Sequence, residues 1–204
     1  SAMARELALH EFAHMYHYER DHPSHTQSTE EAIFLALAGH SVEGRKLTHC
    51  YQIANHMRDI YADDLWLDLA PADKLVAFLE SGLAAAVVDR PRDPPTRERV
   101  ATEPPRFSGP VEPASRLTPA SDPDITAVNA AFALALVERH GLVDDDHRLY
   151  DLAHAATQDT GSVSVDGFKR RFRSLARDPD ESEFRKALVD VTREYATGGE
   201  RAAD

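Results

Sequence analysis

Apolar residues recur at helical spacing along most of the chain. Between Val42 and Tyr61 they stand three or four residues apart, which is the period of one buried helix face. Helix starts are marked as well, because Ser28 followed by Glu31 forms a capping-box pattern ahead of an apolar run. These signals predict an all-α protein with at most a short piece of strand.

Prolines divide this helical pattern into two parts. Nine of the twelve prolines lie between Pro91 and Pro123, in a stretch with few large apolar residues. We therefore predict an N-terminal helical bundle over residues 1–90, a proline-rich linker or strap over 91–122, and a C-terminal helical domain over 123–204. The pattern does not say whether the two helical parts touch.

One predicted helix is apolar on every side. Asp122 and Pro123 mark its start and Gly141 its end, and residues 130–137 contain no polar side chain. A helix of this kind lies in the centre of a core or in a subunit interface. We expect Phe132, in its middle, to be buried.

Composition narrows the classes of function. The 204 residues carry a net charge of −12, which argues against a general binder of nucleic acid or other polyanions. The single cysteine, Cys50, excludes an intrachain disulfide and favours a reducing compartment. No apolar run is long enough to span a membrane and no signal peptide precedes the first predicted helix, so a cytoplasmic location is expected.

The first predicted helix contains the sequence His10-Glu11-x-x-His14. On a helix this spacing places two imidazoles one turn apart on the same face, where they can share a zinc ion. The motif resembles that of the zincin metallopeptidases. The resemblance implies His10 and His14 as zinc ligands and Glu11 as the general base that takes a proton from a metal-bound water.

Other features of this helix favour a different interpretation. The motif lies only a few residues from Met3, the expected natural start, whereas the zincin helix packs beneath a β-sheet that precedes it. On a helical wheel His10, His14 and His17 lie roughly opposite an apolar arc, so we expect them to face water or a partner and to bind metal only adventitiously or structurally. The apolar arc consists of Ala8, Phe12, Met15 and Tyr16. The nearest candidates for a third ligand, none of them at the spacing of a zincin subclass, are His17, His22, His25 and His40.

Acidic residues accompany histidines on the helix that contains Cys50. The sequence Asp63-Asp64-x-x-x-Asp68 resembles the magnesium-diphosphate motif of some terpene synthases, but the chain is short for that fold and has no second metal motif, so an acidic helix end and interhelix turn is the preferred interpretation. A polar edge also runs along this helix at steps of three and four. Such an edge can hold a metal, but more often it is the solvated border of an apolar stripe. Its members are His49, Gln52, His56, Asp59 and Asp63.

The densest basic cluster lies on a short helix in the C-terminal part. Such a cluster can bind nucleic acid or an acidic partner. The simpler interpretation is a solvated face whose positive charge balances that of nearby carboxylates. The cluster consists of Lys169, Arg170, Arg171, Arg173 and Arg177.

These observations leave three hypotheses for function. The leading one is a non-enzymatic adaptor or regulatory module that acts through helical contacts with a protein partner or with itself. The second is a zinc-dependent hydrolase built on His10, Glu11 and His14. The third is a nucleic-acid-associated protein that uses the basic helix over residues 168–177. No cofactor is expected, apart from zinc at the histidine stripe.

Overall fold

The computed structural model describes residues 2–89, 122–161 and 163–198, and every regular element in these ranges is a helix. The all-α prediction is therefore confirmed. The helices are α1 (Ala2–Glu19), α2 (Pro23–Thr26), α3 (Thr29–Leu37), α4 (Gly44–Leu67), α5 (Asp73–Val88), α6 (Pro123–His140), α7 (Arg148–Ala156), α8 (Val165–Arg173) and α9 (Glu181–Thr197). None of these helices is both long and apolar enough to cross a membrane.

Local sequence signals mark the start of α3 and both ends of α6. The Ser28 hydroxyl accepts the backbone N–H of Glu31 and starts α3. The Asp122 carboxylate accepts the backbone N–H of Asp124 at the start of α6, with Pro123 as the first helical residue. Gly141 ends α6 in the left-handed conformation that glycine adopts without strain. These three predicted signals are confirmed.

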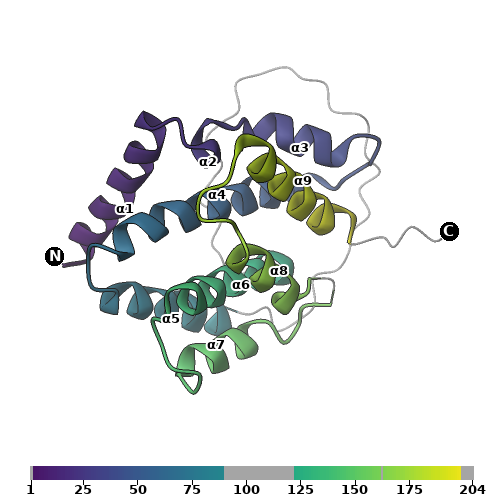
Figure 1. Ribbon diagram of the computed structural model, residues 1–204. Helices are drawn as coiled ribbons and strands as arrows, with labels where there is room; N and C mark the ends of the chain where they lie inside the picture. The colour runs from purple at the N-terminus through teal and green to yellow at the C-terminus, as the bar shows by residue number, and fades with distance from the viewer. Residues whose placement is uncertain (1, 90–121, 162, 199–204) are drawn as a thin grey trace.

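Helix α6 is the centre of the core. Every residue from Ile125 to Val137 except Asn129 is buried, including Phe132. Helices α4, α5, α7 and α8 surround it (Figure 1). The prediction of burial is confirmed, and helices of the same chain supply the cover.

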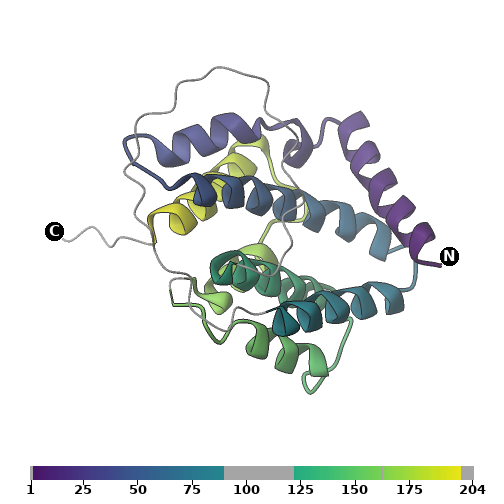
Figure 2. The same ribbon diagram turned by 180° about the vertical axis from the view of Figure 1, so that it is seen from behind.

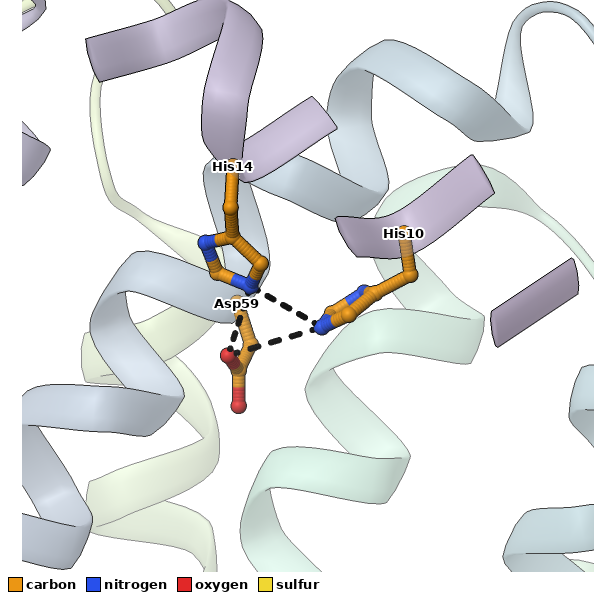
Figure 3. Close-up of side chains that lie close together, drawn as sticks. All are labelled: His10, His14 and Asp59. Carbon is orange, nitrogen blue, oxygen red and sulfur yellow. Dashed lines mark hydrogen bonds and ion pairs between the residues drawn. The ribbon is translucent and has the colours of Figure 1, made fainter. Parts of the chain in front are cut away.

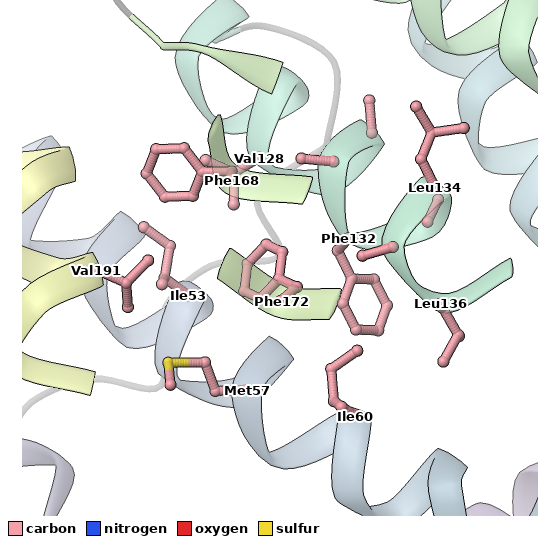
Figure 4. Packing of buried hydrophobic residues seen from close by; sticks show 14 of the residues in the cluster. Ile53, Met57, Ile60, Val128, Phe132, Leu134, Leu136, Phe168, Phe172 and Val191 are labelled. Atoms are coloured by element: carbon pink, nitrogen blue, oxygen red, sulfur yellow. The ribbon is translucent and has the colours of Figure 1, made fainter. Parts of the chain in front are cut away.

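The two parts of the chain share one core. Side chains of α4, α6, α8 and α9 meet in a single cluster, in which Met57, Phe132 and Phe172 lie close together (Figure 4). Helix α9 also packs on α3 and α4, and α7 packs on α5. The helices on either side of the predicted linker therefore touch extensively. The linker itself, apart from Asp122, lies outside the described residues.

A buried ion pair fastens α4 to α6. The Arg139 guanidinium donates from Nε to Asp64 Oδ1 at 2.7 Å and from Nη2 to Oδ2 at 2.5 Å, and its Nη1 donates to the carbonyl oxygen of Leu175 at 2.7 Å. The two side chains are only 6% and 12% exposed. The pair of Asp64 and Arg139 therefore joins α4, α6 and the segment after α8. Asp64 binds Arg139, whereas its neighbour Asp63 binds His10.

Replacing Phe132 with Ala will test the central position of α6. Phe132 stacks on His56, with ring centroids 4.3 Å apart, and meets the edge of Phe172. The resulting cavity is expected to reduce the free energy of unfolding by about 3 to 5 kcal/mol, without changing the mass of the particle in solution. Urea denaturation and light scattering measure the two quantities. Phe34→Ala is the matched control, because Phe34 is 74% exposed; equal stabilities of the two variants would contradict the central position of α6.

Replacing Asp64 with Asn will test the ion pair. Although burial favours the protonated acid, hydrogen bonds from Arg139 and His140 lower the pKa of Asp64 to about 2, below its ordinary value of 3.8. The substitution leaves Arg139 buried without a counter-charge and is expected to cost about 3 kcal/mol at pH 7.

The pH dependence of that loss has a definite sign. A carboxyl with a lowered folded-state pKa adds stability above about pH 4 and loses that contribution as the pH falls toward 2. The difference between the native chain and Asp64→Asn should therefore shrink between pH 5 and pH 2.5 in denaturant titrations. Asp68→Asn, one turn further along and exposed, should match the native chain throughout.

Candidate metal centre

Helix α1 lies against α4 with its histidine side inward. The rings of His10, His14 and His17 are half-buried against α4 and α2, whereas Phe12 and Met15 are 63% and 59% exposed. The prediction that the histidine stripe faces water was wrong. The physical reason is that the facing edge of α4 is polar and offers carboxylates to the imidazoles, so the less apolar side of α1 makes the better contact.

Three atoms that can bind a metal ion, two from α1 and one from α4, lie close together. His10 Nε2 lies 3.0 Å from His14 Nε2 and 3.8 Å from Asp59 Oδ1, and His14 Nε2 lies 3.4 Å from the same oxygen (Figure 3). Within the described residues, these three side chains are the set with the spacing of a metal site. The side chains are 20 to 27% exposed, so each of the three is partly accessible to solvent.

The triangle has the dimensions of one face of a tetrahedral metal site. With metal–ligand distances of 2.0 to 2.1 Å, neighbouring ligand atoms of a tetrahedral zinc ion are about 3.3 to 3.4 Å apart. The three observed separations lie within about half an ångström of this value. Two imidazoles and one carboxylate also form a ligand set that zinc accepts.

The orientation of His10 is fixed from behind. Its Nδ1 donates to Asp63 Oδ1 at 2.8 Å, because a carboxylate only accepts. Asp63 is 3% exposed and also accepts the indole N–H of Trp66 at 2.6 Å. A metal-binding histidine typically donates its second nitrogen to such a carboxylate. The neutral form of His10 therefore directs its Nε2 lone pair at the centre of the triangle.

The orientation of His14 is fixed through a chain of hydrogen bonds. The backbone N–H of Ser24 donates to His22 Nδ1, so this nitrogen is an acceptor. It also accepts a hydrogen bond from the Ser24 hydroxyl, with 2.7 Å between Nδ1 and Oγ. The Ser24 oxygen then accepts from His25 Nδ1, also at 2.7 Å. His25 Nε2 is left as the acceptor for His14 Nδ1, at 2.7 Å. The Nε2 lone pair of His14 therefore also points at the centre.

With these tautomers, the space between the two rings favours a cation. Without one, two nitrogen lone pairs would face each other at 3.0 Å beside the Asp59 carboxylate. A proton shared by the rings or a metal ion removes this repulsion.

The pKa values agree with a centre that favours positive charge. Burial acts to lower the pKa of His10, but the hydrogen bond and charge of Asp63 and the charges of Asp59 and Glu11 outweigh it and raise this pKa. Burial likewise favours the neutral form of Asp59, yet its contacts with the His14 and His56 rings and the charges of His56 and His10 lower its pKa below the ordinary range.

His25 shows the opposite behaviour. Burial, together with the charges of His14, His17, Arg58 and His22, lowers the pKa of His25 to about 3. His25 is therefore neutral near pH 7, as an acceptor for His14 must be.

The remaining residues expected at the motif have different surroundings. His17 is not within the triangle, because its Nε2 donates to the carbonyl oxygen of Tyr61 at 3.0 Å. Glu11 is exposed, and its charge reaches His10. His40 is exposed beyond the end of α3, away from α1.

Asp59, the third member of the triangle, is the residue that the motif alone did not supply. Asp59 follows the second histidine of the motif by 45 positions, so no local spacing links them. The available signal was the polar edge of α4, where Asp59 lies one turn after His56 and one turn before Asp63.

The basic cluster on α8 is partly compensated by carboxylates. Lys169 and Arg173 both contact Glu138 at 3.0 Å, and Arg171 contacts Glu194 at 2.8 Å. Arg170 and Arg177 are exposed. Acidic neighbours thus offset much of the charge that binding to a polyanion would use.

The sequence matches the family of unknown function DUF5781 over residues 1–197, and the chain belongs to this family. No curated protein and no solved structure matches it.

Proposed function

We propose that this member of the family is a zinc-dependent hydrolase, with His10, His14 and Asp59 as metal ligands and Glu11 as general base. The observation that carries the proposal is the triangle of ligand atoms, in which the neutral forms of both histidines direct lone pairs inward. Of the three hypotheses from the sequence, this is the one that the geometry supports best.

The number and exposure of the ligands favour a catalytic site over a structural one. Structural zinc sites are closed by four protein ligands, whereas catalytic sites use three and leave one position for water or substrate. The triangle provides three, and these three side chains are 20 to 27% exposed. Bound zinc would lower the pKa of a coordinated water to about 7 and so supply a nucleophile at neutral pH.

The surrounding residues would hold this site in place. Asp63 and His25 keep the two imidazoles oriented through their Nδ1 atoms. His56 Nδ1 lies 3.6 Å from the second oxygen of Asp59, which leaves Oδ1 turned toward the histidines. Glu11 follows the first ligand directly and lies on the exposed side of α1, where it can accept a proton from water.

A second candidate is the contact module that the sequence favoured. The observation in its support is the exposed apolar side of α1, which lies opposite the metal ligands.

Zinc binding tests the proposed ligands directly. Protein purified without nickel chromatography is expected to contain about one zinc per chain by elemental analysis. His14→Gln and Asp59→Asn, which remove one ligand each, should lower zinc affinity by about 100-fold or more in competition titrations with a chromophoric chelator. His40→Gln is the matched control, since this exposed histidine lies outside the centre. Unchanged zinc affinity in Asp59→Asn would contradict the assignment of the third ligand.

Hydrolysis tests the catalytic part of the proposal. Zinc-loaded protein should cleave p-nitrophenyl acetate or bis(p-nitrophenyl) phosphate, and removal of zinc with a chelator should abolish the activity. Glu11→Gln should keep stoichiometric zinc while kcat falls by about 100-fold or more, because a general base contributes about that factor. If Glu11→Gln hydrolyses the esters at the native rate, Glu11 is not the base. If the rate survives chelation, the protein is not a zinc hydrolase.

A further inference from the structure

The outer side of α1 is an unusual surface for a helix of a globular protein. Phe12, Met15 and Tyr16 are 45 to 63% exposed along it. Both views place α1 at the edge of the molecule, with α4 and α2 on its inner side (Figures 1 and 2). A contiguous apolar patch of this kind marks a contact site for another molecule.

The exposed residues follow a heptad spacing that ends in opposite charges. Arg5, Ala8, Phe12, Met15 and Glu19 are all exposed and are separated by steps of three, four, three and four. This is the repeat that lets two helices pack along a common seam. The seam is apolar in its middle, basic at its N-terminal end and acidic at its C-terminal end.

We propose that this seam is a symmetric interface at which α1 packs antiparallel against α1 of a second copy of the chain. In a two-fold interface the same patch meets itself. With the axis at Phe12, each Arg5 lies opposite Glu19 of the other copy, and each Ala8 lies opposite Tyr16. The charges are then complementary at both ends, and a small residue faces a large one on either side of the axis.

The orientation follows from the charges. A parallel pair would place Arg5 against Arg5 and Glu19 against Glu19, which are repulsive contacts. A lipid surface is a poorer occupant, because helices that bind membranes are rich in Lys and Arg around their apolar side, whereas Glu11 and Glu19 flank this one.

The size of the patch indicates a weak, reversible dimer. If a large side chain offers about 200 Å², the exposed parts of Phe12, Met15 and Tyr16 amount to about 330 Å² per chain, and the exposed Arg5, Ala8 and Glu19 extend the contact toward about 1,000 Å² in total for the two chains. This is at the lower limit for a specific interface, where dissociation constants of about 10 to 100 µM are expected. The interface uses the side of α1 opposite to the metal ligands, so it does not rest on the proposed zinc chemistry.

Sedimentation equilibrium on the full chain tests the proposal. The native chain should pass from 22.6 kDa to twice that mass over about 1 to 300 µM. Phe12→Glu should stay monomeric throughout with an unchanged melting temperature, because Phe12 is largely exposed. Phe34→Glu, on α3 and 74% exposed, should dimerise like the native chain. A native chain that remains at 22.6 kDa, or Phe12→Glu that dimerises normally, would overturn the proposal.

Charge reversal tests the antiparallel register. Arg5→Glu and Glu19→Arg should each weaken the dimer by about tenfold, since two attractive pairs become repulsive. The double variant Arg5→Glu/Glu19→Arg restores opposite charges at both ends and should recover native affinity. If it remains as weak as the single variants, the two helices do not pair in this register. If the apolar side instead binds vesicles of neutral lipid and the chain stays monomeric, the occupant is a membrane surface and the dimer is wrong.

Discussion

The structure depends on the burial of α6. A helix with apolar side chains all round cannot present any side to water, so four other helices must cover it. Because α4 comes from before the proline-rich stretch and α8 from after it, this burial draws the two parts of the chain onto one core. Helix α4 is thereby fixed against α6 and α9. Part of its polar edge takes part in this contact, since Gln52 and His56 bond to Asn129 of α6. The part around Asp59 and Asp63 is the surface on which α1 packs.

The polar edge of α4 then decides which side of α1 faces inward. Asp63 is almost completely buried there and needs hydrogen-bond donors, since an unpaired buried carboxylate is costly. His10 and the Trp66 indole supply these donors. The apolar contacts between α1 and α4 are few and centre on Ala13 and Trp66. The electrostatic contacts of the imidazoles therefore outweigh the burial of Phe12 and Met15, which remain on the outside.

Sequence patterns predicted the parts of the fold that are determined locally. The capping residues Ser28 and Asp122 and the terminating glycine Gly141 act on neighbouring backbone groups, so their roles can be recognised from spacing alone. The burial of Phe132 was predictable because its helix offers no polar side. The inward side of α1 was not predictable, because a helical wheel shows which residues share a face but not the chemistry of the surface that the face will meet. The proximity of Asp59 to His10 and His14 was not predictable for the same reason: the polar edge of α4 was recognised as able to hold a metal, but its approach to α1 is a consequence of tertiary packing.

The two faces of α1 differ in chemistry: the inner face is polar and hydrogen-bonded, and the outer face is apolar and exposed. On the inner face, the hydrogen bond that His10 donates to Asp63 and the chain of hydrogen bonds that begins at the Ser24 backbone turn the Nε2 atoms of His10 and His14 toward each other. On the outer face, the side chains around Phe12 need a surface that excludes water. Both properties follow from the orientation that the α4 carboxylates impose. A turn of α1 about its axis that buried Phe12 would leave Asp63 without His10 and would separate both histidines from Asp59, so the exposed apolar side and the convergence of the histidines have one structural cause.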